Sequence, residues 1–211
     1  MAVRGIAFIG GEGPEPNKSR RLAAGADIIV AADSGLIAAE EAGVKPDWII
    51  GDMDSLNDPS RLETYPPQRI RLYPADKDYT DTELALMLLW EKGCEEIGLI
   101  GGGGGRTDHL FAIRALFERP RCPDQWFTAG EELHCLKAPD SVRFRVLPGN
   151  LISLFPVGAG PWSAKSQGLK WTLDGLLWDP GIFGISNAAL ETHFSVSAEK
   201  GRFLVIINQK D

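Results

Sequence analysis

Cysteine and histidine are both scarce in this sequence, with three of each among 211 residues. Cys94, Cys122 and Cys135 are odd in number and widely spaced, and they form neither a C-x-x-C pair nor a cluster with histidine. This pattern argues against a zinc site and against a disulfide framework. We interpret the three cysteines as reduced, structural residues of an intracellular protein.

Positive charge and long apolar runs are also in short supply. Lys plus Arg is 22 and Asp plus Glu is 29, so the formal net charge is −7, and no basic run is present. Binding to nucleic acid or to a membrane surface is therefore not expected. There is no apolar stretch near the length of a transmembrane helix and no signal-peptide pattern at the start, so the cytoplasm is the expected location.

Short apolar runs alternate with helical segments along residues 1–137. We expect strands at residues 5–9, 27–32, 48–50, 70–73, 95–100 and 126–128. The best-marked helix follows Thr80-x-x-Glu83, a capping box, and ends at Gly93. Repeated strand, loop and helix units predict a Rossmann-like α/β domain, with a parallel sheet covered by helices on both faces.

Beyond residue 137 helical spacing disappears and short alternating segments take over. These segments predict strands at residues 142–147, 151–155, 169–173, 194–197 and 203–207. Turn residues such as Asp179-Pro180-Gly181 separate them. We therefore expect a smaller all-β domain at residues 138–211, after the α/β domain at 1–137.

Two acidic stretches follow expected strands. Asp52 and Asp54 come directly after residues 48–50, and the aspartates after residues 70–73 are Asp76, Asp78 and Asp81. The carboxyl ends of parallel strands form the ligand-binding edge of a sheet. Carboxylates gathered there repel one another, and an oxygen-preferring ion such as magnesium would relieve the repulsion. A plain turn in which Asp54 or Ser55 starts a helix is the simpler alternative.

Five consecutive glycines, residues 101–105, lie between an expected strand and a helix that begins near Arg106. Such a loop suits a phosphate, and a guanidinium beside it suits a polyphosphate. Neither the dinucleotide fingerprint nor the Walker A ending is present. A flexible turn, with Asp108 as a helix cap, is the alternative.

The sequence resembles the thiamine pyrophosphokinase (thiamine diphosphokinase) family in a series of motifs that run in the family's order. They are Ala32-Asp33-Ser34-Gly35, Gly51-Asp52-Met53-Asp54-Ser55, Asp76-Lys77-Asp78-Tyr79-Thr80-Asp81, Gly104-Gly105-Arg106-Thr107-Asp108-His109, Gly168-Leu169-Lys170-Trp171 and Ile185-Ser186-Asn187. They span nearly the whole chain. This sequence departs from the family at one point: many members have an asparagine a few residues after the Asp-His pair, and none follows Asp108-His109 here.

The resemblance implies an enzyme that moves the diphosphate of ATP onto the hydroxyl of thiamine, giving thiamine diphosphate and AMP. It also implies a carboxy-terminal β-sandwich and a homodimer with active sites between subunits. The implied metal and catalytic carboxylates, with Mg²⁺ as cofactor, are Asp52, Asp54, Asp78 and Asp81, joined in catalysis by Arg106 and Asp108. The implied ATP contacts are Asp33, Lys77, Gly104, Gly105 and Arg106, and the implied thiamine contacts are Trp171, Ser186 and Asn187.

Two rival functions stay open at this point. One is a related diphosphokinase that acts on another alcohol, such as a hydroxymethyl pterin. The other is a non-catalytic protein that binds a nucleotide or senses thiamine. Trp171 can also be read as a core residue of the β-sandwich, and Lys77 as a residue that merely balances charge.

Overall fold

The computed structural model describes residues 2–56 and 58–208, which divide into two compact units. The first unit comprises residues 2–56 and 58–113 with Trp126–Ala129. The second comprises Arg114–Gln125 and residues 130–208. Among these residues, no helix combines the length and the apolar character needed to cross a bilayer.

A parallel sheet forms the centre of the first unit. Its strands, in spatial order, are β5 (Glu96–Ile100), β1 (Arg4–Phe8), β2 (Ile28–Ala32), β3 (Trp48–Gly51) and β4 (Ile70–Leu72). A short strand, β6 (Gln125–Phe127), lies next to β5. The inner strands β1 and β3 bury most of their residues, and Ile6, Phe8 and Ile49 are almost fully buried, as a sheet covered on both sides requires.

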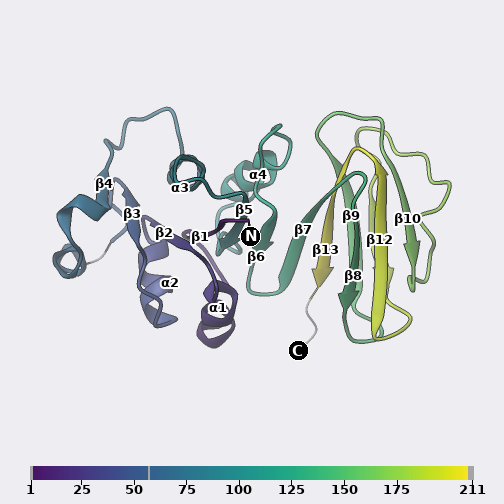
Figure 1. The fold of residues 1–211 in the computed structure, drawn as a ribbon, viewed down its shortest axis with the longest axis horizontal. Coiled ribbons are helices and arrows are strands. Elements are labelled where there is room, and N and C mark those ends of the chain that lie inside the picture. Colours follow the sequence, from purple (N-terminus) through teal and green to yellow (C-terminus); the bar gives the residue numbers. More distant parts are fainter. Residues whose placement is uncertain (1, 57, 209–211) are drawn as a thin grey trace. The chain divides into compact units, whose positions relative to one another are not determined.

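Helices cover both faces of this sheet. α1 (Pro16–Ala23) and α2 (Gly35–Glu41) lie on one face, and α3 (Asp81–Glu91) lies on the other, with α4 (Thr107–Leu116) near β5 (Figure 1). Two short 3-10 helices, η1 (Pro59–Thr64) and η2 (Pro67–Arg69), connect β3 to β4. The sequence prediction of an α/β fold with a parallel sheet is confirmed.

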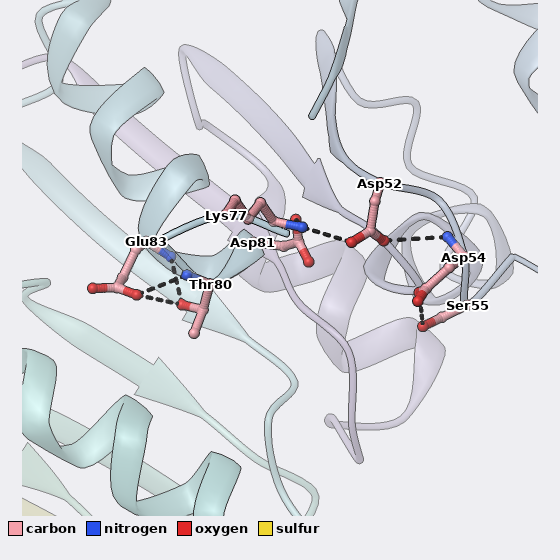
Figure 2. A network of polar contacts seen from close by, with 7 residues as sticks. All are labelled: Asp52, Asp54, Ser55, Lys77, Thr80, Asp81 and Glu83. Carbon is pink, nitrogen blue, oxygen red and sulfur yellow. Dashed lines mark hydrogen bonds and ion pairs between the residues drawn. The ribbon is translucent and has the colours of Figure 1, made fainter. Parts of the chain in front are cut away.

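The capping box that the sequence predicts forms at the start of α3. The Thr80 amide donates to the Glu83 carboxylate at 2.8 Å, and the Glu83 amide donates to Thr80 Oγ1 at 3.3 Å (Figure 2). Both contacts satisfy amide groups that have no partner within the helix. As a result Asp81 is held as the first residue of α3, directly beside the end of β3.

The second unit is a β-sandwich. One sheet has the order β11 (Gly184–Ala188), β9 (Leu151–Val157), β13 (Arg202–Asn208) and β7 (Glu131–Lys137). The other has the order β10 (Ser163–Gln167), β12 (His193–Lys200) and β8 (Ser141–Arg145). Phe144, Leu154, Val196 and Phe203 belong to one buried cluster that draws side chains from both sheets. The all-β prediction for this part of the chain is confirmed.

The strand predicted at residues 169–173 is wrong. Leu169 makes only an isolated bridge with Ala189, because Gly168 adopts φ 78° and turns the chain away from an extended path. The sequence prediction also missed three strands, β10, β11 and β7, of which β7 pairs with β13. In β7 only Leu133 and Leu136 are buried, and this spacing lacks the two-residue alternation that identifies a strand.

Candidate functional site

Three aspartates converge where β2, β3 and the loop before α3 meet. Asp33 directly follows β2, Asp52 directly follows β3, and Asp81 opens α3. Carboxylate oxygens of all three lie within 4.8 Å of one another, and each side chain is partly buried. We call this group the carboxylate cluster. It occupies the carboxyl edge of the parallel sheet, where open α/β sheets bind their ligands.

The backbone at two positions allows the carboxylates to approach. Asp33 has φ 48°, in the left-handed region, and its amide donates to the Ile50 carbonyl at 2.9 Å. Gly51 has φ 139°, and a Cβ built there would lie 3.0 Å from Asp81 Oδ1 and 3.3 Å from Asp33 Cβ. A side chain at residue 51 would therefore press on two members of the cluster, so the glycine is needed for both its dihedral angle and its lack of bulk.

Lys77 is the cation that joins the cluster. Its ammonium donates to Asp52 Oδ2 at 2.6 Å and lies 3.3 Å from Asp81 Oδ1 (Figure 2). Its side chain is 11% exposed, so the ion pairs are shielded from solvent more than ordinary surface pairs are. The contact with Asp52 is short and charge-assisted, which makes it the stronger of the two.

The electrostatics of Asp52 and Asp81 differ. The Lys77 hydrogen bond, helped by the Asp54 amide at 3.3 Å, holds the pKa of Asp52 below its usual value. The pKa of Asp81 is raised, first because burial removes its hydration and then because Asp52 and Asp33 repel its negative charge. Burial alone would lower the pKa of Lys77, but its contacts with Asp52 and Asp81 raise it. Asp81 is thus the more basic of these two carboxylates.

The cluster fits a hard divalent cation. Asp33 Oδ1 and Asp81 Oδ1 are buried and have no hydrogen-bond partner among the described residues. Asp81 Oδ1 does lie 3.3 Å from Lys77, but as an ion pair without hydrogen-bond geometry. Unsatisfied anionic oxygens in a buried position are costly, and oxygen donors of this kind suit magnesium or manganese better than zinc.

Two aspartates that the sequence also suggested lie outside the cluster. Asp54 is exposed, and its carboxylate accepts from Ser55 Oγ at 3.0 Å, while Asp52 lies between it and Lys77 (Figure 2). Asp78 is exposed as well. Their roles as catalytic and metal-binding residues stay predictions.

The family resemblance implies Asp33 as an ATP contact and not as one of the metal carboxylates. The structure brings it to the cluster because β2 and β3 are neighbours, with Ala32 opposite Ile50. The available signal was its position directly after an apolar strand, the same position that marks Asp52. Spatial strand order, which sequence alone does not give, decides that these two strand ends are adjacent.

The glycine loop after β5 divides into two parts. The amides of Gly101, Gly102 and Gly103 donate to the carbonyls of Phe127, Gly10 and Glu12, at 3.0, 3.0 and 2.9 Å respectively. Those amides are committed to the backbone, which closes this part of the loop to a phosphate. Gly104 and Gly105, which the resemblance implies as ATP contacts, are exposed.

Arg106 and Asp108 form an exposed ion pair at the start of α4. Arg106 Nε donates to Asp108 Oδ1 at 3.1 Å and its Nη2 donates to Oδ2 at 2.6 Å. This pair lowers the pKa of Asp108, first through the hydrogen bonds from Arg106. The Arg106 side chain is 72% exposed, so an incoming anion can reach it. Asp108 lies inside the helix and not at its cap, because α4 begins at Thr107.

In the second unit, Asn187 fixes the backbone of Trp171. Its side-chain oxygen accepts from the Trp171 amide at 3.1 Å, and its Nδ2 donates to the Trp171 carbonyl at 2.6 Å. Asn187 is buried, whereas Trp171 is 55% exposed and has Lys170 Nζ 4.5 Å from its ring centroid. Ser186 is exposed, with φ 58°. The Trp171 ring is therefore not core filler, and its exposed face already accommodates a cation.

Fold and site together define a class of two-part proteins. Each combines a parallel α/β unit, which carries a carboxylate cluster at the carboxyl edge of its sheet, with a β-sandwich.

Comparisons with known proteins identify the family within this class. Residues 19–123 match the model described as the thiamin pyrophosphokinase catalytic domain. A thiamine pyrophosphokinase of Bacillus subtilis (strain 168) is 37% identical over 92 residues, and the matched part spans 42% of this chain and 42% of that relative.

Solved structures extend the likeness over the whole fold. The thiamin pyrophosphokinase of Geobacillus thermodenitrificans has a TM-score of 0.74 and 26% identity, with 98% of each chain covered. The Bacillus subtilis structure has a TM-score of 0.78 and 22% identity, covering 98% of this chain and all of the other. The chain belongs to the thiamine pyrophosphokinase family.

A stability measurement tests the electrostatics of the cluster. Because folding raises the pKa of Asp81, the ionised carboxylate destabilises the folded state. The stability that the protonated Asp81 contributes is fully present below the pKa of the unfolded chain, near 3.8. It is lost as pH rises through the pKa of the folded chain. We therefore expect Asp81→Asn to raise the urea midpoint of the metal-free chain at neutral pH, with the difference from wild type vanishing in acid.

The exposed neighbour Asp76 provides the matched control, and Asp76→Asn should leave the midpoint unchanged at every pH. Chelator is present throughout, so that bound metal does not stabilise the wild type selectively. A lower midpoint for Asp81→Asn at neutral pH would contradict this account, since the ion pair with Lys77 would then outweigh the lost hydration.

Proposed function

We propose that the protein is a thiamine diphosphokinase that transfers the diphosphate of ATP to the hydroxyl of thiamine. The observation that carries this proposal is the carboxylate cluster, in a chain of this family, at the strand ends where a triphosphate and its metal would bind. The products are thiamine diphosphate and AMP. The amides of Gly101, Gly102 and Gly103 take no part in this proposal, because they already donate to backbone carbonyls.

The reaction is an in-line displacement at the β-phosphorus of ATP. The thiamine oxygen forms a bond to the β-phosphorus. At the same time the bond between the β-phosphorus and the oxygen that bridges it to the α-phosphorus breaks, and AMP leaves with that oxygen. A magnesium ion, held by Asp33, Asp52 and Asp81, would supply electrostatic stabilisation of the phosphate charge. Arg106 is exposed and free to exchange Asp108 for a phosphate oxygen, and it adds positive charge on the nucleotide side.

Lys77 has a positioning role in this proposal. Without nucleotide its ammonium neutralises part of the cluster and keeps Asp52 and Asp81 together. A triphosphate brings competing anionic oxygens, to which the same ammonium can donate. Asp81 is the residue that we propose as the acceptor of the thiamine hydroxyl proton, because its Oδ1 lies in the cluster, is buried and has no hydrogen-bond partner among the described residues.

Product analysis is the direct test of the reaction. Purified protein is incubated with magnesium, ATP and thiamine, and the expected products are equal amounts of AMP and thiamine diphosphate. Asp52→Asn should lower turnover by about 100-fold or more, because it removes a negative charge that would hold the magnesium ion. Asp76→Asn should leave turnover unchanged. ADP as product, transfer only to a hydroxymethyl pterin, or nucleotide binding without turnover would each overturn the proposal.

The same assay on Asp54→Ala and Asp78→Ala tests the wider set of carboxylates. Both residues are exposed, so neither substitution should change the thermal midpoint. Loss of turnover with an unchanged midpoint would support the roles that the family resemblance implies for them. Full activity would restrict the metal site to the carboxylate cluster.

We further propose that the protein acts as a homodimer whose active site combines the cluster of one subunit with Trp171 of the other. The second unit exposes several large apolar side chains between residues 171 and 190, which favours a partner surface of this kind. They are Trp171, Leu176, Leu177, Ile182, Phe183, Ile185 and Leu190, and Leu177 is 84% exposed. Trp171 would stack on the cationic thiazolium of thiamine.

Subunit mixing tests the dimer, the shared site and the role of Trp171 together. Trp171→Ala alone should raise the KM for thiamine, with the loss of about 0.5 to 2 kcal/mol of cation-π attraction, and leave the KM for ATP unchanged. Asp52→Asn alone should be inactive. The assay keeps thiamine well below its KM, so that the raised KM lowers the activity of Trp171→Ala. When the two variants are mixed and allowed to exchange subunits, each mixed dimer regains one intact site of two, so these sites should add about a quarter of the wild-type activity to what the unmixed dimers retain.

The controls for this experiment are each variant exchanged with itself. Activity of the mixture no higher than the average of the two separate variants would contradict a site shared between subunits. A monomer in light scattering at assay concentration would contradict the dimer itself.

A further inference from the structure

Cys122 and Cys135 lie together in the second unit, although 13 residues separate them in the sequence. Their sulfur atoms are 3.7 Å apart, and both are free thiols. Cys135 belongs to β7, and its amide donates to the Asp124 carbonyl at 2.8 Å, which keeps the segment after Cys122 beside that strand. The sequence does not predict that these two thiols meet, because their spacing matches no recognised cysteine motif.

Two cationic side chains surround the thiol pair. Arg202 Nη1 donates to Cys122 Sγ at 3.1 Å, and the same nitrogen donates to the Arg119 carbonyl at 2.7 Å. Lys137 lies near the pair and is bonded to Asp124 at 2.8 Å. A guanidinium that donates directly to a sulfur favours the thiolate form, which is the nucleophilic form of cysteine.

The two thiols are not equivalent. The pKa of Cys122 is lowered to about 7, first because the Cys135 thiol donates to its sulfur and also because Lys137 and Arg202 are close by. The pKa of Cys135 is raised, first by the same hydrogen bond and then by burial. Asp124 opposes the ionisation of Cys122 but is itself paired with Lys137. The pair therefore divides into an attacking sulfur and a sulfur that keeps its proton.

We propose that Cys122 and Cys135 form an oxidation site at which a hydroperoxide converts the two thiols into an intramolecular disulfide. The Cys122 thiolate attacks one peroxide oxygen, so that an S–O bond forms, the O–O bond breaks and hydroxide leaves as water with the Cys135 proton. The Cys135 thiolate then attacks the Cys122 sulfenic sulfur, forming the S–S bond and releasing hydroxide. Two electrons pass from the two sulfurs to the peroxide, which is the oxidant.

The fold permits the closure that this step needs. The two sulfur atoms are 3.7 Å apart, and a disulfide requires them to approach to about 2 Å, so a small shift of one cysteine is enough. Cys135 is fixed in the middle of β7, whereas residues 120–124 before β6 form neither helix nor strand. Cys122 can therefore shift toward β7. Cys135 is the partly exposed member and gives a small oxidant access to the pair.

Peptide mass analysis tests the proposal without any assay of activity. Arg121 and Lys137 bracket a tryptic peptide, residues 122–137, that contains both thiols and no internal Lys or Arg. Reduced full-length protein is treated with hydrogen peroxide, unfolded, alkylated and digested. We expect this peptide to become two hydrogens lighter and to lose both alkyl adducts, and dithiothreitol should restore both.

Cys94 provides the matched control, because it lies in the first unit and is buried. It should stay fully alkylated after peroxide treatment, and Cys94→Ser should form the same cross-linked peptide as wild type. Cys135→Ser cannot close the disulfide, and a sulfenic-acid trap such as dimedone should then label Cys122.

Several results would overturn the proposal. They are persistent alkylation of both thiols in wild type, a disulfide that includes Cys94 or joins two chains, oxidation that ends at sulfinic acid, and absence of the dimedone label in Cys135→Ser. Because the readout is mass, these outcomes are independent of whether the proposed diphosphokinase activity is found.

Discussion

The mutual repulsion of Asp33, Asp52 and Asp81 is the constraint on which the site depends. Two unit charges about 4 Å apart repel by roughly 4 kcal/mol at an effective dielectric constant of 20. Lys77 compensates one of the three charges, most strongly that of Asp52. Burial, together with repulsion from Asp52 and Asp33, raises the pKa of Asp81, and the buried Oδ1 atoms of Asp33 and Asp81 have no hydrogen-bond partner among the described residues. We propose that a bound cation completes this arrangement and offsets the repulsion.

Local backbone features hold the carboxylates in place. The left-handed conformation of Asp33 and the side-chain-free Gly51 bring two strand ends close enough for the cluster to form. The Thr80–Glu83 capping box sets where α3 begins and so places Asp81 at its first residue. Asp33 and Gly51 lie at the ends of β2 and β3, where residues 30–32 and 49–51 are buried, so the rigid part of the fold supports the strained part.

Much of this could be predicted from sequence. The α/β and all-β parts, the capping box, the position of Asp52 at a strand end and that of Asp81 at a helix start all follow from local patterns. The membership of Asp33 in the cluster could not be predicted, because it depends on β2 and β3 being neighbours in space. Sequence reasoning also expected a strand at residues 169–173, where the Asn187 side chain instead holds the Trp171 backbone. The meeting of Cys122 and Cys135 is likewise a product of tertiary structure.

Anomalous diffraction from crystals grown with manganese tests the central claim most directly, since manganese accepts the same oxygen ligands as magnesium. The account predicts a peak bonded to carboxylate oxygens of Asp33, Asp52 and Asp81, with the Lys77 ammonium displaced from between them. A cluster without a peak, or a peak held by Asp54 and Asp78 alone, would contradict it.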